Sequence, residues 1–157
     1  MNKTRLKKYA NLIAVCGVNV QKGQEVLINA ELDQPEFVKM VVEACYKAGA
    51  GKVSVDWSYQ PLTKLHVRYQ TTKKLGTLDN WQVEKWKHQA EVLPAKIYLI
   101  SEDPDGLAGI NQKKYAKAMA ARGKLIKPIR NKMENKYQWC IAAVPGKEWA
   151  KKLFPNE

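Results

Sequence analysis

Apolar positions recur along the chain every three or four residues in some segments and as short continuous runs in others. The first pattern is typical of amphipathic helices and the second of buried strands. In chain order, these patterns predict helices at residues 3–17, 34–48, 61–75, 79–92, 111–121 and 147–153, and strands at residues 25–30, 52–57, 95–101 and 137–144. Residues 25–57 thus hold a strand, a helix and a strand, which is the length of one right-handed crossover between parallel strands.

This alternation predicts an α/β fold. We expect residues 1–157 to form a single three-layer domain, with a mainly parallel sheet of about four or more strands flanked by helices. Residues 33–36 (DQPE) and 79–82 (DNWQ) have the spacing of a helix capping box, in which Asp accepts from the first turn of the helix. Gly49 is expected to close the second helix, and Pro145 to end the last strand.

Composition narrows the class of protein. The 157 residues are 45% apolar, which excludes a disordered chain, and no apolar run approaches the ~20 residues that cross a bilayer, so no membrane association is expected. Three cysteines (Cys16, Cys45 and Cys140) lie far apart and form no CxxC pair, so neither a zinc knuckle nor a redox motif is available. Free thiols in apolar surroundings favour the reducing cytoplasm.

The net charge of +12 is shared equally by residues 1–78 and 79–157. Residues 106–133 differ from their surroundings because they hold eight cations and no carboxylate. Such a segment could neutralise the phosphates of a nucleic acid, or it could be a solvated face or a surface for an acidic partner. Since Tyr115 is the only aromatic residue there, base stacking has little support, and nucleic acid is not the expected partner.

Ligands of open parallel sheets bind beyond the carboxyl ends of the strands. The polar residues at those positions are Glu31, Asp33, Asp56, Ser58, Ser101, Glu102 and Asp103. Among them, Asp56, Ser58, Ser101 and Glu102 are the candidate binding residues, suited to a metal ion or an ammonium group. The same side chains could instead cap helices, and Asp33 is expected to do so.

Signatures of a complete catalytic site are missing. No GxGxxG follows the first strand, and residues 49–52 (GAGK) lack the Ser or Thr of a phosphate-binding loop and lie before a strand rather than a helix. His66 and His88 are the only histidines and have no zinc-binding spacing. No catalytic residue and no metal ligand is therefore assigned to this chain.

Three stretches of sequence carry a family resemblance. They are residues 6–24 (LKKYANLIAVCGVNVQKGQ), residues 48–55 (AGAGKVSV) and residues 139–155 (WCIAAVPGKEWAKKLFP), and residues 102–104 (EDP) add to them. Together they resemble the N-terminal region of the thermophilic metalloaminopeptidases, the family that includes aminopeptidases S and T.

The resemblance implies an exopeptidase that removes residues from the N-termini of peptides with two divalent metal ions and acts as a homodimer. Zinc, cobalt or magnesium would serve the full-length protein, and none is expected in this chain, because the family's metal ligands belong to a C-terminal half with no counterpart here. The implied role is that of a non-catalytic N-terminal domain, whose partners are its own C-terminal catalytic domain and the peptide substrate. Two alternatives stay open from the residues alone: a basic nucleic-acid-binding module, and a small-molecule-binding domain that uses Asp56, Ser58 and Glu102.

Overall fold

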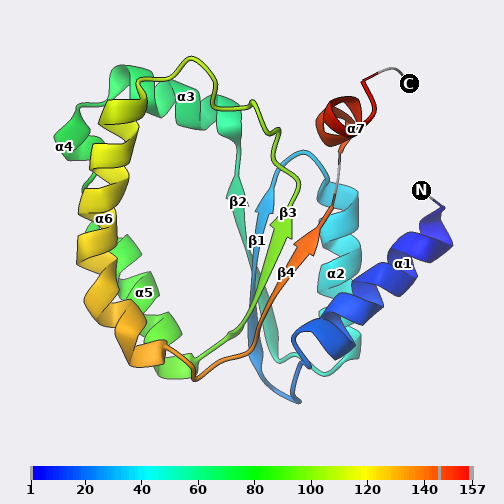
Figure 1. The fold of residues 1–157 in the computed structure, drawn as a ribbon. Helices are drawn as coiled ribbons and strands as arrows, with labels where there is room; N and C mark the ends of the chain where they lie inside the picture. The colour runs from blue at the N-terminus through cyan, green and yellow to red at the C-terminus, as the bar shows by residue number, and fades with distance from the viewer. Residues whose placement is uncertain (1, 145, 156–157) are drawn as a thin grey trace. The chain divides into compact units, whose positions relative to one another are not determined.

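The computed structural model describes residues 2–144 and 146–155. Its single four-stranded sheet consists of β1 (Glu25–Glu31), β2 (Lys52–Ser58), β3 (Ala95–Ile100) and β4 (Trp139–Ala143). The strands lie in the order β2-β1-β3-β4, and every neighbouring pair is parallel (Figure 1). The prediction of an α/β fold with a mainly parallel sheet of about four strands is confirmed.

Helices connect and flank these strands. They are α1 (Lys3–Leu12), which continues into a π-helical turn η1 (Ile13–Gly17), then α2 (Pro35–Lys47), α3 (Gln60–Tyr69), α4 (Thr72–Leu75), α5 (Asn80–Val92), α6 (Gln112–Met133) and α7 (Lys147–Leu153). Most agree with the predicted helices to within a few residues. Two do not, and both differences lie in connections between strands.

The predicted helix at residues 61–75 is divided into α3 and α4, because Thr71 begins a new helix by accepting a hydrogen bond from the Lys74 backbone N–H at 3.1 Å. The predicted helix at residues 111–121 runs on to Met133 and passes through Pro128. Proline removes one backbone donor and crowds the preceding turn. Pro128 is exposed, so water can satisfy the carbonyl that loses its partner.

Contacts between residues divide the chain into two compact units. The sheet unit comprises Met1–Tyr59, Pro94–Pro104 and Tyr137–Glu157, and holds all four strands with α1, α2 and α7. The helical unit comprises Gln60–Leu93 and Asp105–Lys136, and holds α3, α4, α5 and α6. The helical unit therefore consists of the two connections that lead from β2 to β3 and from β3 to β4.

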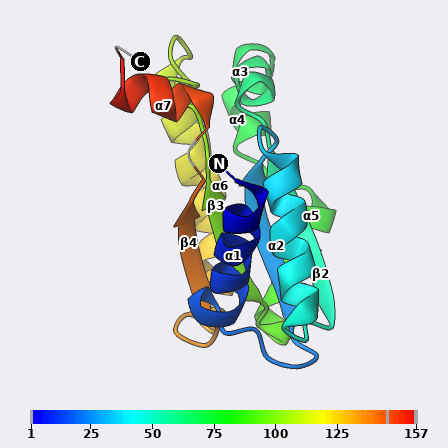
Figure 2. The ribbon, with the colours of Figure 1, turned by 90° about the vertical axis from the view of Figure 1, so that its right-hand side faces the viewer.

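In the sheet unit, α1 and α2 lie side by side over one face of the sheet (Figure 2). Ile28 at the centre of β1 pairs with Val55 and with Ile97, so all three side chains point to that face. Ile28 and Ile97 are completely buried there, as is Val41 of α2. Burying a side chain of this size contributes about 1.5–3 kcal/mol, so this face holds the core of the unit.

In the helical unit, α6 packs against both α4 and α5. The approach to α4 is close, because a Cβ atom on Gly76 would lie 3.1 Å from the Cβ of Ala121. Arg122 of α6 donates a hydrogen bond to the Thr77 carbonyl oxygen at 2.8 Å and ties the two helices together. The unit thus has its own packing, independent of strand pairing.

One of the two predicted capping boxes is correct. Asp79 caps α5, and the Gln82 side chain accepts from the Asp79 N–H at 3.0 Å. The prediction that Asp33 caps α2 is wrong, because the helix begins at Pro35 and Gln34 takes the capping position without a side-chain hydrogen bond. A proline is favoured at the first helical position, which leaves Asp33 one residue too early. The expected end of the last strand at Pro145 lies outside the described residues.

The turns that enter β1 and β2 touch each other through glycine backbone. Gly23 N–H donates to the Gly49 carbonyl at 2.8 Å, and Gly51 N–H donates to the Gln24 carbonyl at 2.9 Å. Gly49 follows α2 with φ +106°, a conformation open to glycine, as expected for a residue that closes a helix. A Cβ atom on Gly51 would lie 2.6 Å from the Gly23 carbonyl oxygen. Position 51 therefore requires glycine because the neighbouring backbone leaves no room for a Cβ atom, and not because of an unusual backbone conformation.

We expect Gly51→Ala to lower the free energy of unfolding by about 1–3 kcal/mol, because the new methyl group must displace backbone. Gly123→Ala is the matched control, because Gly123 lies within α6 and a Cβ atom there would meet nothing outside the helix backbone within 4 Å. The same methyl group should therefore raise the free energy of unfolding by about 0.5–1 kcal/mol. Urea unfolding followed by circular dichroism measures both. Equal effects of the two changes would contradict the contact.

Candidate functional site

The carboxyl edge of the sheet brings two of the strand-end residues together. Ser101, directly after β3, donates its hydroxyl to the Asp33 carboxylate at 2.6 Å. Ser101 is 6% exposed, whereas Asp33 lies at the surface. Asp33 therefore connects the end of β1 to the end of β3 instead of capping α2.

Neighbouring contacts extend this edge to β4 and α7. The Gln34 side chain donates to the Val144 carbonyl at the end of β4, and a Cβ atom on Gly146 would lie 3.1 Å from the Asp33 carboxylate. The Trp149 indole of α7 donates to the Glu102 carbonyl. The residues after β1, β3 and β4 thus form one hydrogen-bonded layer, in which Glu102 takes part through its backbone.

Asp56 and Ser58 lie apart from this layer. Both belong to β2, which is separated from β3 by β1, so they are about 10 Å from the Ser101 strand at the usual strand spacing. Ser58 donates its hydroxyl to the Ala30 carbonyl at 3.4 Å. The structure therefore pairs Ser101 with Glu102 at one end of the edge and Asp56 with Ser58 at the other, and does not gather the four candidates into one site.

The cavity at this edge is small. It lies between the ends of β1 and β3 and the start of α2, and its walls, which include Glu31, Gln34, Phe37 and Ser101, leave no room for a water molecule. Ligand pockets usually measure roughly 300–1,000 Å³. The edge is consequently suited to closing the end of the core rather than to holding a substrate.

The second face of the sheet, which points away from α1 and α2, carries a buried lysine that the sequence analysis did not identify. Lys96 of β3 pairs with Leu27 and Trp139 and is 2% exposed. Its Nζ atom lies 5.0 Å from the centre of the Tyr137 ring. Burial lowers the pKa of Lys96 to about 8, and the negative charge of Asp56 opposes part of that shift. The one available signal was a single charge within the otherwise apolar run at residues 95–100.

Metal ligands are not assembled in the part of the chain that the structure describes. Across residues 2–144 and 146–155, no three His, Cys, Asp or Glu side chains are grouped so that they could hold an ion. His66 and His88 lie on α3 and α5, both exposed. These residues do not fit a centre of two divalent ions, which needs several convergent oxygen and nitrogen ligands. Within the same residues, no helix is long and apolar enough to cross a membrane.

Comparisons with known proteins agree across almost the whole chain. A model of the thermophilic metalloprotease family, M29, matches residues 2–157. The chain is 32% identical to aminopeptidase AmpS of Bacillus subtilis over 154 residues and 30% identical to aminopeptidase PepS of Streptococcus thermophilus over 155 residues. Each alignment covers 98% of this chain and 38% of the relative.

The fold agrees with a solved structure as well. Wild-type AmpT from Thermus thermophilus matches with a TM-score of 0.86 at 27% identity, and the match covers 98% of this chain and 39% of that chain. The chain therefore spans less than two fifths of the length of these relatives.

The hydrogen bond between Ser101 and Asp33 should be detectable as a coupling. In a double-mutant cycle of Ser101→Ala and Asp33→Ala, we expect a coupling free energy of about 1 kcal/mol, because a charged acceptor strengthens the bond while the exposure of Asp33 weakens it. The control cycle pairs Asp33→Ala with Ser58→Ala, whose hydroxyl has a different acceptor. Additivity in both cycles would show that the bond contributes nothing to stability.

Lys96 should make stability depend on pH. Because its pKa is about 8 in the folded chain and near 10.5 when unfolded, the unfolded chain binds more protons between these values. The free energy of unfolding should rise through this window, by at most about 3 kcal/mol. Lys96→Met should remove this rise, and Lys39→Met, a change at an exposed lysine of α2, should keep it. Urea unfolding at pH 7 to 10.5 measures the free energy of unfolding of each variant. If this free energy changes with pH in the same way in both variants, Lys96 does not carry a buried charge.

Proposed function

The chain belongs to the thermophilic metalloprotease family M29, and from this membership we propose that it is the N-terminal, non-catalytic domain of a metal-dependent aminopeptidase. The resemblance noted in the sequence is thereby confirmed. The proposed reaction is the removal of N-terminal residues from peptides, in line with the aminopeptidase names of the relatives. The observation that carries the proposal is a match along nearly the whole chain to proteins more than twice its length.

The distribution of chemical groups supports a division of labour. A metal pair, when bound in the full-length protein, would polarise the scissile carbonyl and activate a water. At the carboxyl edge of this sheet, Asp33 is engaged with Ser101, and no side chain of the described residues joins a group that could hold a metal. The domain's contribution is then to support and shape the site that the rest of the protein builds.

The surface of the sheet unit supports a further packing partner. β4 is at one end of the strand order, and its Trp139 and Ile141 are 60% and 61% exposed. Leu153 and Phe154, at the end of α7, are also more than half exposed. Large apolar side chains at an edge strand are usually covered in the complete assembly. We assign the C-terminal catalytic domain of the same protein as the partner that covers them.

Four finer points belong to the same proposal. Zinc, cobalt or magnesium would be the metal of the full-length enzyme, and the enzyme would act as a homodimer. Its compartment would be the cytoplasm, which agrees with the free thiols of Cys16, Cys45 and Cys140. Peptides would be the substrate.

The division of labour predicts that the 157-residue chain hydrolyses no aminoacyl p-nitroanilide with zinc, cobalt or magnesium, because the ligands of a two-metal centre are not present in its described part. A chimera that carries residues 1–157 in front of the C-terminal part of Thermus thermophilus AmpT should show metal-dependent hydrolysis. Kinetic assays with each metal, before and after chelation, measure both proteins.

Two controls make this test decisive. Metal content after dialysis reports binding without reference to activity, and the chain alone should retain less than one equivalent. In the chimera, Trp139→Ser and Ile141→Ser should weaken association with the added part, whereas Lys39→Ser should not. Robust turnover or a tightly held metal in the chain alone would contradict the proposal.

A further inference from the structure

The positive charge of the chain is concentrated in the helical unit. Its two segments, Gln60–Leu93 and Asp105–Lys136, hold 15 Lys and Arg against 5 Asp and Glu, a net charge of +10. The sheet unit holds 12 against 10, a net charge of +2. This difference is not visible when the net charge is counted for residues 1–78 and 79–157, because β3 separates the two basic segments along the chain.

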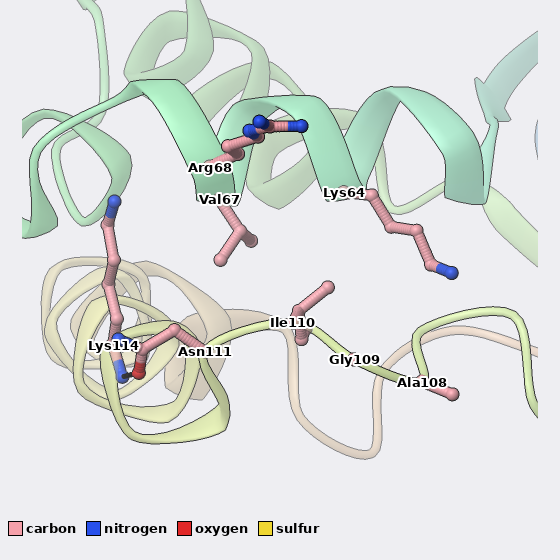
Figure 3. A pocket seen from close by; sticks show the side chains of 8 residues that line it. All are labelled: Lys64, Val67, Arg68, Ala108, Gly109, Ile110, Asn111 and Lys114. Atoms are coloured by element: carbon pink, nitrogen blue, oxygen red, sulfur yellow. Dashed lines mark hydrogen bonds between the residues drawn. The ribbon is translucent and has the colours of Figure 1, made fainter.

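Within the helical unit, a pocket of about 520 Å³ opens between α3 and the loop that leads into α6. Figure 3 shows Val67 and Ile110 pointing toward each other across its middle, with Lys64 at one end and Lys114 at the other. Val67 is 2% exposed and forms an apolar floor. The pocket thus combines an apolar centre with a positive charge at each end, and its size is that of a small-molecule site.

The charged side chains that line this pocket are all positive. The walls of the pocket contain three cations (Lys64, Arg68 and Lys114) and no carboxylate. Across residues 2–144 and 146–155, none of the three forms an ion pair. Arg68 lies 5.5 Å from the centre of the Tyr69 ring. Cations that line one pocket repel each other, and a bound anion would relieve that repulsion.

The start of α6 adds to the positive potential. The helix is 22 residues long, and no acidic residue occupies its first turn. Asn111 caps it by accepting from the Lys114 N–H at 2.9 Å, and Asn111 also lines the pocket. Gly109, with φ +80°, gives the loop the turn that brings its backbone along the pocket wall. The amino end of a long helix favours an anion.

From this geometry we propose that the pocket between α3 and the start of α6 binds a small phosphate-bearing organic molecule. Its phosphate groups contact Lys114 and Lys64, and its organic part packs on the half-exposed Ile110 above the buried Val67. A phosphate carries close to two negative charges and several acceptor oxygens, so it compensates the pocket's cations better than a single carboxylate does.

Calorimetric titration of the chain with ADP, pyrophosphate and inorganic phosphate tests the proposal. We expect ADP to bind more tightly than pyrophosphate, because only ADP can use the apolar floor. Lys64→Gln combined with Lys114→Gln should weaken ADP binding by about tenfold or more, since two charge-assisted contacts are lost. Lys64→Arg with Lys114→Arg should restore most of the affinity.

The matched control changes two exposed lysines of α6 that do not line the pocket. Lys117→Gln with Lys124→Gln removes the same net charge and should weaken ADP binding less than about twofold at moderate salt. If both double variants lose the same ADP affinity, binding depends on the overall positive charge of the chain and not on the pocket, and the proposal is overturned. Equal affinity for ADP and pyrophosphate, binding of a single-stranded oligonucleotide alone, or no rise in the melting temperature of the unaltered chain with ADP would overturn it as well.

Discussion

The parallel pairing of β1 with strands on both of its sides is the constraint from which the architecture follows. Parallel neighbours cannot be joined by a tight turn, so each connection must cross the sheet through a longer segment. The connection from β1 to β2 uses α2, which helps to form the core. The connections from β2 to β3 and from β3 to β4 form the helical unit. One pairing requirement thus produces both the apolar core of the sheet unit and a separate helical body.

The two bodies differ in what they offer to other molecules. The sheet unit is close to neutral, and its carboxyl edge is occupied by contacts such as that between Ser101 and Asp33. It presents large apolar side chains at β4 and α7, which suits packing against more protein. The helical unit is strongly basic and contains an open pocket without acidic side chains. The proposed support of a catalytic domain and the proposed binding of an anion therefore involve different units of the chain.

The strands were predictable from local signals: β1, β3 and β4 contain short apolar runs, whereas β2 alternates apolar and polar residues. Asp33 was misassigned because Pro35 moves the start of α2 by one residue, and its partner Ser101 is distant in sequence. The grouping of the candidate residues depends on the strand order, which places β1 between β2 and β3 and is not encoded locally. Lys64 and Lys114 belong to different connections, so no window of sequence contains their pocket.

The central position of β1 also has a consequence for the order in which the chain is made. Synthesis runs from the N-terminus, and β1 can pair with β2 as soon as Lys52–Ser58 has emerged. Its other edge stays open until Ala95–Ile100 leaves the ribosome, and β3 in turn waits for Trp139–Ala143. A nascent chain of intermediate length therefore displays an unpaired, apolar strand edge. Unpaired strand edges are prone to aggregation, so synthesis of this chain passes through a stage that is more exposed to aggregation than the finished fold.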